Sequence, residues 1–169
     1  VLKTEVAVAQ TRMETRSHVN MAFEEADPLQ EIVNGYPKYF ETAWQGMMAK
    51  KLGLAHYVRK TDDEIISDLH TILRLAETDM TIFYRQLATI DIESDADDAK
   101  SFEPLRGAYY VDDQITADVI SRVAVWLRRY KDRVRSDELS SEARIQKMNA
   151  TNPKYVIRNY IAQLAIEKS

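Results

Sequence analysis

The chain has 169 residues, of which 45% are hydrophobic and 30% charged, and its formal net charge is −4. This composition is typical of one folded domain and excludes an intrinsically disordered protein. The absence of cysteine excludes disulfides, thiolate nucleophiles and thiolate metal ligands from these residues.

The first part of the chain predicts a weakly structured lead-in. Residues 1–35 are polar and lack a firm period, so we expect a helical or partly mobile segment. Near its end, Asp27-Pro28 is typical of a helix start, and Gly35 of a helix stop. Residues 36–169 are then expected to form a helical region. Because the chain begins without Met and ends within a helical pattern, we expect it to be part of a longer protein.

Residues 37–88 predict three helices. One begins at Pro37 and ends at Gly53, with Met47 and Met48 filling the core. The next begins at Thr61, which forms a capping box with Glu64, and carries a regular core stripe. A short helix follows over residues 79–88.

Residues 91–101 interrupt the helical pattern with an acidic loop, and a brief helical segment follows over 102–109. The longest predicted helix covers residues 113–135, and another covers 141–149. No alternating pattern predicts a strand of useful length. The expected fold is therefore all-α, an irregular orthogonal bundle of about seven helices with no significant sheet.

The last helix is predicted from a full set of start signals. Asn152 is expected to cap it, and Pro153 to occupy its first position, where the missing N–H is not needed. Its buried face is then expected to consist of Ile157, Tyr160, Ile161, Leu164 and Ala165.

The acidic loop resembles the opening of a calcium site, with carboxylates at 91, 93, 95 and 97. An EF-hand also needs Gly at its sixth position and Glu at its twelfth, where this chain has Ala96 and Phe102. A solvated loop is the favoured interpretation.

Charge is unevenly distributed along the chain. Residues 1–111 carry 12 Lys/Arg and 19 Asp/Glu, whereas residues 112–169 carry 11 and 8. The basic, aromatic stretch 126–135 superficially resembles a nucleic-acid patch, but its aromatic residues lie on the apolar stripe of one helix. We expect no nucleic-acid partner, and a contact of these cations with an acidic surface of a larger parent protein.

No catalytic, cofactor-binding or metal-binding residue is predicted within these residues. His18, His56 and His70 form no known ligand pair, and the four glycines are too isolated for a phosphate-binding loop. No apolar run approaches the ~20 residues that span a membrane, and no signal-peptide pattern occurs, so we expect a cytoplasmic protein without a membrane partner.

Several segments resemble one known family. The stretch 148–166 reads M-N-x-x-N-P-K-Y-V-I-R-N-Y-I-A-Q-x-A-I, which closely resembles the C-terminal signature of the selenoprotein-O (YdiU-type) pseudokinases. Trp44, Met48 and the run Lys51-Leu52-Gly53-Leu54 resemble the family segment that ends in K-L-G-L. Residues 79–87 resemble its D-x-T-x-F-[FY]-R-x-L segment, and Trp126 with Tyr130 follow in the family's order. The resemblance spans about residues 36–168, and residues 1–35 show none.

The resemblance implies a parent enzyme with a kinase-like fold. Members of the family bind ATP in an inverted orientation with a divalent metal, and transfer AMP to Ser, Thr or Tyr hydroxyls of proteins. Their nucleotide-binding and metal-binding residues lie upstream of the matched segments, and their redox-active Cys or selenocysteine lies beyond the position of Ser169. The resemblance therefore implies ATP and Mg or Mn for the parent, and no catalytic residue here.

Two hypotheses follow for function. The first is the C-terminal helical segment of a protein adenylyltransferase, which supports the catalytic lobe and is inactive alone. Its partners would be the rest of its own parent chain and the protein substrates of that parent. The alternative is a stand-alone helical protein-interaction module without an enzymatic parent.

Overall fold

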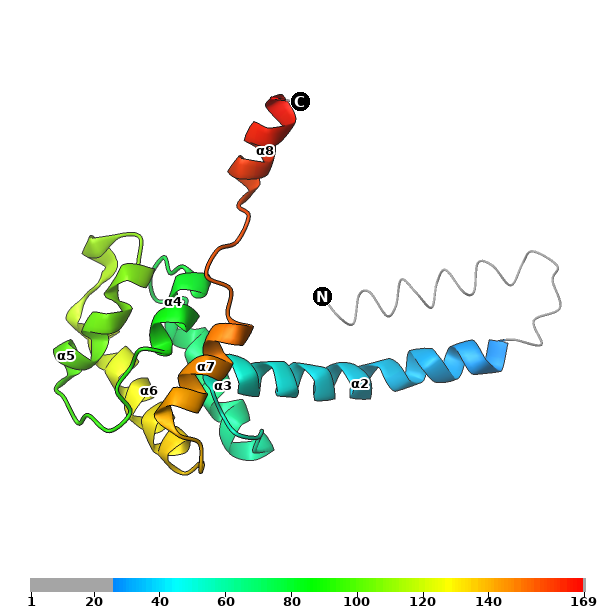
Figure 1. The fold of residues 1–169 in the computed structure, drawn as a ribbon, viewed down its shortest axis with the longest axis horizontal. Coiled ribbons are helices and arrows are strands. Elements are labelled where there is room, and N and C mark those ends of the chain that lie inside the picture. Colours follow the sequence, from blue (N-terminus) through cyan, green and yellow to red (C-terminus); the bar gives the residue numbers. More distant parts are fainter. Residues whose placement is uncertain (1–25, 169) are drawn as a thin grey trace. The chain divides into compact units, whose positions relative to one another are not determined.

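The computed structural model describes residues 26–168, which are helical and contain no strand (Figure 1). An isolated antiparallel bridge joins Thr78 and Tyr109. The prediction of an all-α fold is confirmed. The elements in chain order are α2 Ala26–Leu52, α3 Arg59–Ile72, α4 Met80–Leu87, α5 Asp98–Phe102, the 3-10 helices η1 Glu103–Ala108 and η2 Asp112–Gln114, α6 Ala117–Arg135, α7 Ser141–Thr151 and α8 Asn159–Glu167.

The chain divides into two compact units, Val1–Trp44 and Gln45–Ser169. The first unit is described over residues 26–44, the first part of helix α2. The second unit contains the remaining helices and the hydrophobic core. None of the helices in the described residues is long and apolar enough to cross a membrane.

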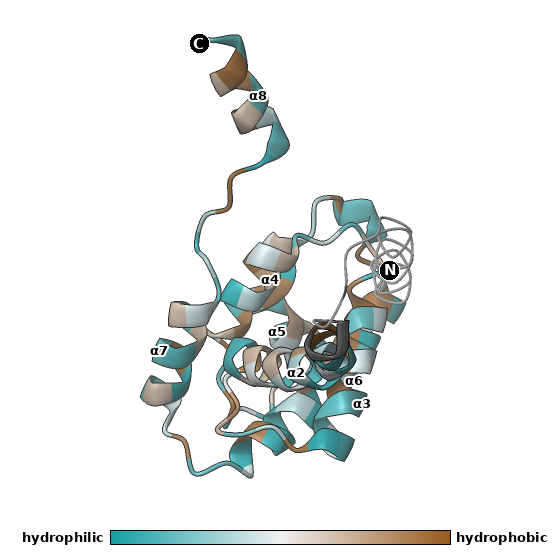
Figure 2. Cartoon of the chain, turned by 90° about the vertical axis from the view of Figure 1, so that its right-hand side faces the viewer, coloured by the Kyte–Doolittle hydropathy of each residue, from teal (hydrophilic) through white to brown (hydrophobic). Residues whose placement is uncertain are grey.

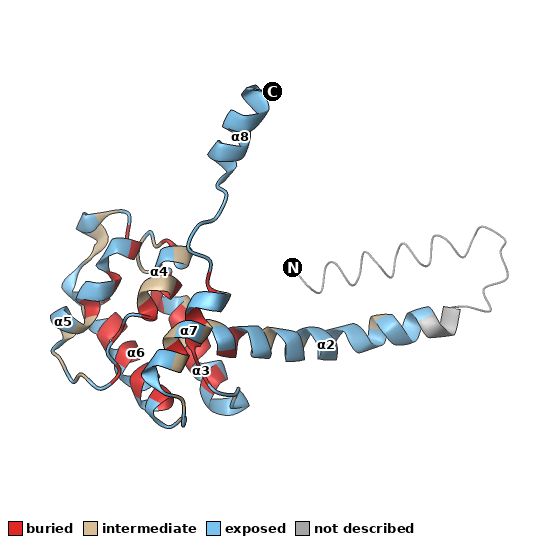
Figure 3. Ribbon diagram, viewed as in Figure 1, coloured by how far each residue is buried: buried red, intermediate tan, exposed pale blue. Residues whose placement is uncertain are grey.

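Helix α6 lies at the centre of this core, where it packs against α3 and α5. The side chain of Thr116 caps its start by accepting a hydrogen bond from the Val119 backbone N–H. Most of its apolar residues recur at helical spacing and are buried, as the red turns of α6 in Figure 3 show, whereas Val125 is 48% exposed. Trp126 stacks on Tyr130 with ring centroids 5.2 Å apart, and its indole N–H donates to the Ile65 carbonyl at 2.8 Å. Both large aromatic residues are therefore core residues, as predicted.

Two predicted boundaries near the start of the described residues are wrong. Helix α2 continues through Gly35 and Pro37 instead of stopping and restarting there. A glycine ends a helix by taking a positive φ, and Gly53 is the glycine that does so in the described residues, with φ 70°. The predicted stop at Gly53 is confirmed, while Gly35 keeps an ordinary helical backbone.

The predicted capping box at Thr61 is also wrong. Helix α3 begins earlier, at Arg59, and the carboxylate of Asp62 accepts the Val58 backbone N–H at 2.7 Å. Asp62 is fully buried because it also pairs with Arg133 of α6. A partner distant in the sequence therefore decides how this helix begins.

The predicted start of the last helix is the third correction. Asn152 is the C-cap of α7, with an extended backbone (φ −89°, ψ 116°), because a residue before proline avoids the helical region. Its side-chain amide donates to the Lys51 carbonyl at 2.9 Å, so it does not cap a following helix. Helix α8 begins only at Asn159, and Ile157, expected on a buried face, is 79% exposed.

The other predicted elements are found close to their expected positions. Asp79 caps α4, and the acidic loop precedes α5. Helix α6 lies within the range expected for the longest helix, whereas α7 begins at Ser141 as expected but continues past residue 149 to Thr151. Met48 fills the core as predicted, whereas Met47 is 42% exposed.

Candidate interaction surface and terminal arm

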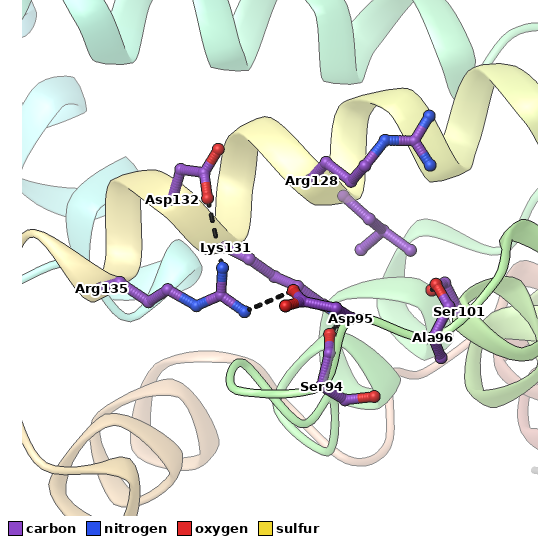
Figure 4. Close-up of a pocket in the computed structure, with 9 residues that line it drawn as sticks. Ser94, Asp95, Ala96, Ser101, Arg128, Lys131, Asp132 and Arg135 are labelled. Atoms are coloured by element: carbon purple, nitrogen blue, oxygen red, sulfur yellow. Dashed lines mark hydrogen bonds and ion pairs between the residues drawn. The ribbon is translucent and has the colours of Figure 1, made fainter.

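The basic residues of α6 are paired with acidic residues of the same chain. Arg135 donates to Asp95 at 3.1 Å and to Asp132 at 3.3 Å, as the dashed lines of Figure 4 mark. Arg128 donates to Asp98, and the buried Lys131 ammonium donates to the Ser94 carbonyl at 2.7 Å. These contacts surround a cavity of about 240 Å³ between α6 and the acidic loop. Several cations of α6 therefore pair with groups of the same chain, whereas the predicted contact with an acidic surface of a larger parent protein stays a prediction.

The acidic loop does not gather its carboxylates around one point. Within residues 26–168, no group of three or more His, Asp or Glu side chains is placed to hold a metal ion. Of the three histidines, His56 lies 3.9 Å from Asp137, His70 lies on α3, and His18 lies outside the described residues. The structure does not bring the histidines together, and the absence of a metal site stays a prediction.

A buried ion-pair network joins α3 to the end of α6. Arg133 donates to Asp62 and to Asp137, each at 2.7 Å, and the three side chains are at most 6% exposed. The guanidinium also donates to the His56 carbonyl at 3.0 Å. Although burial opposes its charge, hydrogen bonds to Asp62 and Asp137 raise the pKa of Arg133. The charged groups of this network are paired with one another within the chain, so we interpret the network as a structural link between α3 and α6.

Asp79 is the centre of a second polar cluster. One carboxylate oxygen accepts the backbone N–H groups of Thr81 and Ile82 at 2.9 and 3.0 Å, which caps α4. The other accepts the Tyr110 hydroxyl at 2.6 Å and the guanidinium of Arg158. Burial alone raises the pKa of Asp79, but hydrogen bonds from Tyr110 and Ile82, with the charge of Arg158, hold that pKa below its usual value. Asp79 therefore binds three separate segments of the chain.

The segments that carry the family resemblance converge near this cluster. Arg85 donates to the carbonyls of Asn149 and Asn152 at 3.0 and 3.1 Å, and Asn152 donates to the Lys51 carbonyl. Tyr130 donates to the Leu52 carbonyl at 2.8 Å. These contacts join residues between 64 and 101 positions apart in the sequence. Together they fix the point at which residues 153–168, the terminal arm, leave the core.

The terminal arm places most of its apolar side chains on the surface. Residues 153–158 are non-helical, and none of the residues of α8 is buried. Hydrophobic stretches are visible along α8 in Figure 2. The most exposed apolar side chains are Tyr155 at 80%, Ile157 at 79%, Ile166 at 67% and Tyr160 at 65%, with Ile161 and Leu164 close to half exposed. A helix of nine residues is marginal alone in water, so its stability depends on burying this face.

A pocket of about 300 Å³ opens where the arm begins, and is called the methionine pocket below. Its apolar wall consists of Met47, Met48, Met80 and Tyr84, and its polar residues include Lys51, His70, Thr81 and Asn152, with Pro153 at the start of the arm. Burial lowers the pKa of Lys51, and burial together with the nearby Arg74 charge lowers the pKa of His70. No local sequence pattern predicts this pocket, because its residues come from four separate segments.

The first unit also carries exposed apolar residues along α2. They include Leu29, Ile32, Tyr36, Tyr39 and Phe40, whose exposed fractions range from 37% to 73%. The rings of Tyr36 and Phe40 lie 6.1 Å apart on one turn of the helix. Within the first unit, this stripe is therefore an exposed apolar surface.

Comparisons with known proteins agree with the segments described above. The sequence model of the family described as "Protein adenylyltransferase SelO" matches residues 5–169. The family match therefore begins earlier than residue 36, where the motifs that carry the resemblance begin. The protein nucleotidyltransferase YdiU of Rhodopirellula baltica is 45% identical over 151 residues, which cover 85% of this chain and 28% of that relative.

The YdiU proteins of Flavobacterium johnsoniae and Aromatoleum aromaticum are each 37% identical. Their matches cover 85% and 86% of this chain, and 27% and 26% of those relatives. The chain thus spans only about a quarter of the length of the curated relatives it matches. The match over nearly all of its residues shows that the chain belongs to the SelO family of protein adenylyltransferases.

Proposed function

We propose that the chain is the C-terminal helical segment of a protein adenylyltransferase that transfers AMP from ATP to Ser, Thr or Tyr hydroxyls of proteins. Within that enzyme the segment supports the catalytic lobe and supplies no reacting group. Its partner is the rest of its own polypeptide. This proposal is more specific than the family membership, which indicates nucleotidyl transfer and hence a nucleotide substrate.

The observation that carries the proposal is the uncovered apolar face of the terminal arm. The arm's root is held by Asp79, Arg85 and Asn152, whereas its tyrosines and isoleucines face solvent. An arm that is held at its root and exposes an apolar face is suited to packing against another folded part of a protein. The curated relatives are several times longer than the chain, so most of such a protein lies outside these residues.

The implied nucleotide and metal do not fit the described residues. The carboxylates of the acidic loop pair with the cations of α6, and no loop in residues 26–168 carries closely spaced glycines. We therefore place ATP and Mg or Mn in the remainder of the parent, and assign no chemical step to this chain.

The proposal is tested by comparing the 169-residue chain with the full-length protein. We expect the full-length protein to transfer labelled AMP from ATP to a protein acceptor, and the 169-residue chain to transfer none. ATP with Mg²⁺ or Mn²⁺ should leave the melting temperature of the 169-residue chain unchanged, because a ligand stabilises only a state that it binds. A clear shift in that temperature would contradict the placement of the nucleotide site.

A matched pair of substitutions tests the supporting role. Ile161→Lys places a charge on the apolar face of α8, whereas Gln163→Lys places the same charge on its polar face, four residues before Glu167. We expect the full-length protein to lose AMP transfer, or to lose protection of the arm from protease, with Ile161→Lys only. Equal behaviour of the two variants favours the alternative, a helical interaction module that does not depend on a catalytic lobe.

A further inference from the structure

The methionine pocket contains groups that its own chain leaves unsatisfied. Met80 is 54% exposed and Met47 42%, although Met48 beside them is almost fully buried. The Lys51 ammonium lies 4.4 Å from the centre of the Tyr84 ring, and no carboxylate in the described residues pairs with it. The side-chain oxygen of Asn152 is buried without a hydrogen-bond partner. The pocket therefore combines open apolar surface with an unpaired cation and an unused acceptor.

The pocket adjoins the start of the terminal arm. Asn152 and Pro153 line it and are also the residues at which the arm begins. Met80 is the first residue of α4, directly after Asp79, and Asp79 holds Arg158 of the arm. Any part of the parent protein that packs against the arm near its root would consequently lie beside the mouth of the pocket.

We propose that the methionine pocket binds an apolar side chain flanked by a carboxylate, presented by the part of the same polypeptide that lies outside these residues. Thioethers adapt their shape to an inserted side chain and contact aromatic rings favourably. A carboxylate supplies the partner that Lys51 lacks. The assignment to the same polypeptide rests on the proposed function, because the relatives' additional length supplies the partner and the arm brings it to the pocket.

The rate at which peroxide oxidises a methionine reports how exposed its side chain is. Oxidation of Met80 therefore measures this contact without any substitution. In the 169-residue chain, Met47 and Met80 should oxidise readily and Met148, which is fully buried, slowly. In the full-length protein, we expect Met80 to be protected about tenfold relative to the 169-residue chain. Hydrogen exchange of α8, recorded in parallel, reports separately on whether the arm is covered.

Charge reversal at each of two adjacent lysines, in separate variants, tests whether a carboxylate of the partner segment pairs with Lys51. Lys51→Glu should restore the oxidation rate of Met80 in the full-length protein, whereas Lys50→Glu, at the exposed neighbouring position, should leave it slow. Slow oxidation of Met148 in both variants shows that they remain folded. Equal rates for Met80 in the two variants would overturn the carboxylate contact.

The outcomes separate this inference from the proposed function. A covered arm with a fully reactive Met80 in the full-length protein overturns the pocket inference and leaves the supporting role intact. An uncovered arm together with a reactive Met80 overturns both. Protection of Met80 in the 169-residue chain that grows with its concentration indicates a second copy in the pocket, and also overturns the inference.

Discussion

Helix α6 and the terminal arm are both amphipathic, yet they differ in what covers their apolar faces. Tyr130 of α6 is fully buried, stacks on Trp126 and donates its hydroxyl proton to a backbone carbonyl. Tyr160 of the arm carries the same side chain and is 65% exposed. A helical stripe therefore predicts that a face will be buried, but it does not tell which part of a protein buries it. In this chain α6 packs on its own neighbours, and we infer that the arm packs on the rest of the parent.

The largest expected effect comes from breaking the buried network of the core. Arg133→Ala leaves Asp62 and Asp137 buried without a cation, and we expect the 169-residue chain to lose about 3–5 kcal/mol of unfolding free energy. Urea denaturation measures this loss. Arg128→Ala is the control, because its ion pair with Asp98 is exposed and should contribute no more than about 1 kcal/mol. Similar losses in the two variants would show that the network is not a source of core stability.

The two glycines at the end of α2 should respond to alanine with opposite signs. Gly53 has φ 70°, and a Cβ there would lie 2.6 Å from Cγ of Arg144, so we expect Gly53→Ala to cost about 1–3 kcal/mol. Gly46 lies within the helix with open space around it, so Gly46→Ala should stabilise by about 0.5–1 kcal/mol. Both are measured by denaturation, and a stable Gly53→Ala variant would contradict the assigned backbone conformation.

The arm's root should weaken when the charge of Asp79 is removed. Asn caps a helix about as well as Asp, so Asp79→Asn removes mainly the pairing with Arg158, at a cost of about 1 kcal/mol. We expect faster amide exchange over residues 154–158. Asp97→Asn, at the exposed cap of α5, should leave these amides unchanged. If both variants exchange alike, Asp79 does not hold the arm.

Acid should have a related effect on the arm's root. The pKa of Asp79 is lower in the folded chain than its usual value, so its contribution to stability is complete above the unfolded pKa. That contribution is lost as the pH falls through the lowered, folded pKa. Amide exchange of residues 154–158 should therefore speed up in acid in the wild-type chain, and less so in Asp79→Asn. A pH response of equal size in both would contradict the role given to this carboxyl.

The smallest expected effect lies on the arm itself. Ile161→Lys in the 169-residue chain should change the unfolding free energy by no more than about 0.5 kcal/mol, because Ile161 is already half exposed. The corresponding change at Val123 of α6, which is fully buried, should prevent folding or cost several-fold more. A large loss from Ile161→Lys would mean that the arm packs on its own core.

Helix content and the core stripe were predictable, because they depend on local spacing. The periodic residues of α6 and the short helix that begins near Asp79 needed no knowledge of distant partners. The starts of α3 and α8 were not predictable in this way. Asp62 is buried in an ion pair with Arg133, and the side-chain amide of Asn152 donates a hydrogen bond to the Lys51 carbonyl. Both partners are distant in the sequence.

The contacts at the root of the terminal arm could not be predicted from the sequence for the same physical reason. Asp79 and Arg158 lie 79 residues apart, and Arg85 and Asn152 lie 67 apart, so no local pattern links them. One signal was available, since all four residues belong to the segments that carry the family resemblance. Their contacts show that these segments hold the root of the terminal arm.

Amide hydrogen exchange of α8, in the 169-residue chain and in the full-length protein, tests the central claim most directly. We predict that residues 159–167 exchange almost as fast as an unfolded peptide in the 169-residue chain, since none of them is buried. In the full-length protein, the same amides should be protected by about 100-fold or more. Equal exchange rates in the two proteins would contradict the claim that this arm packs against the rest of its parent.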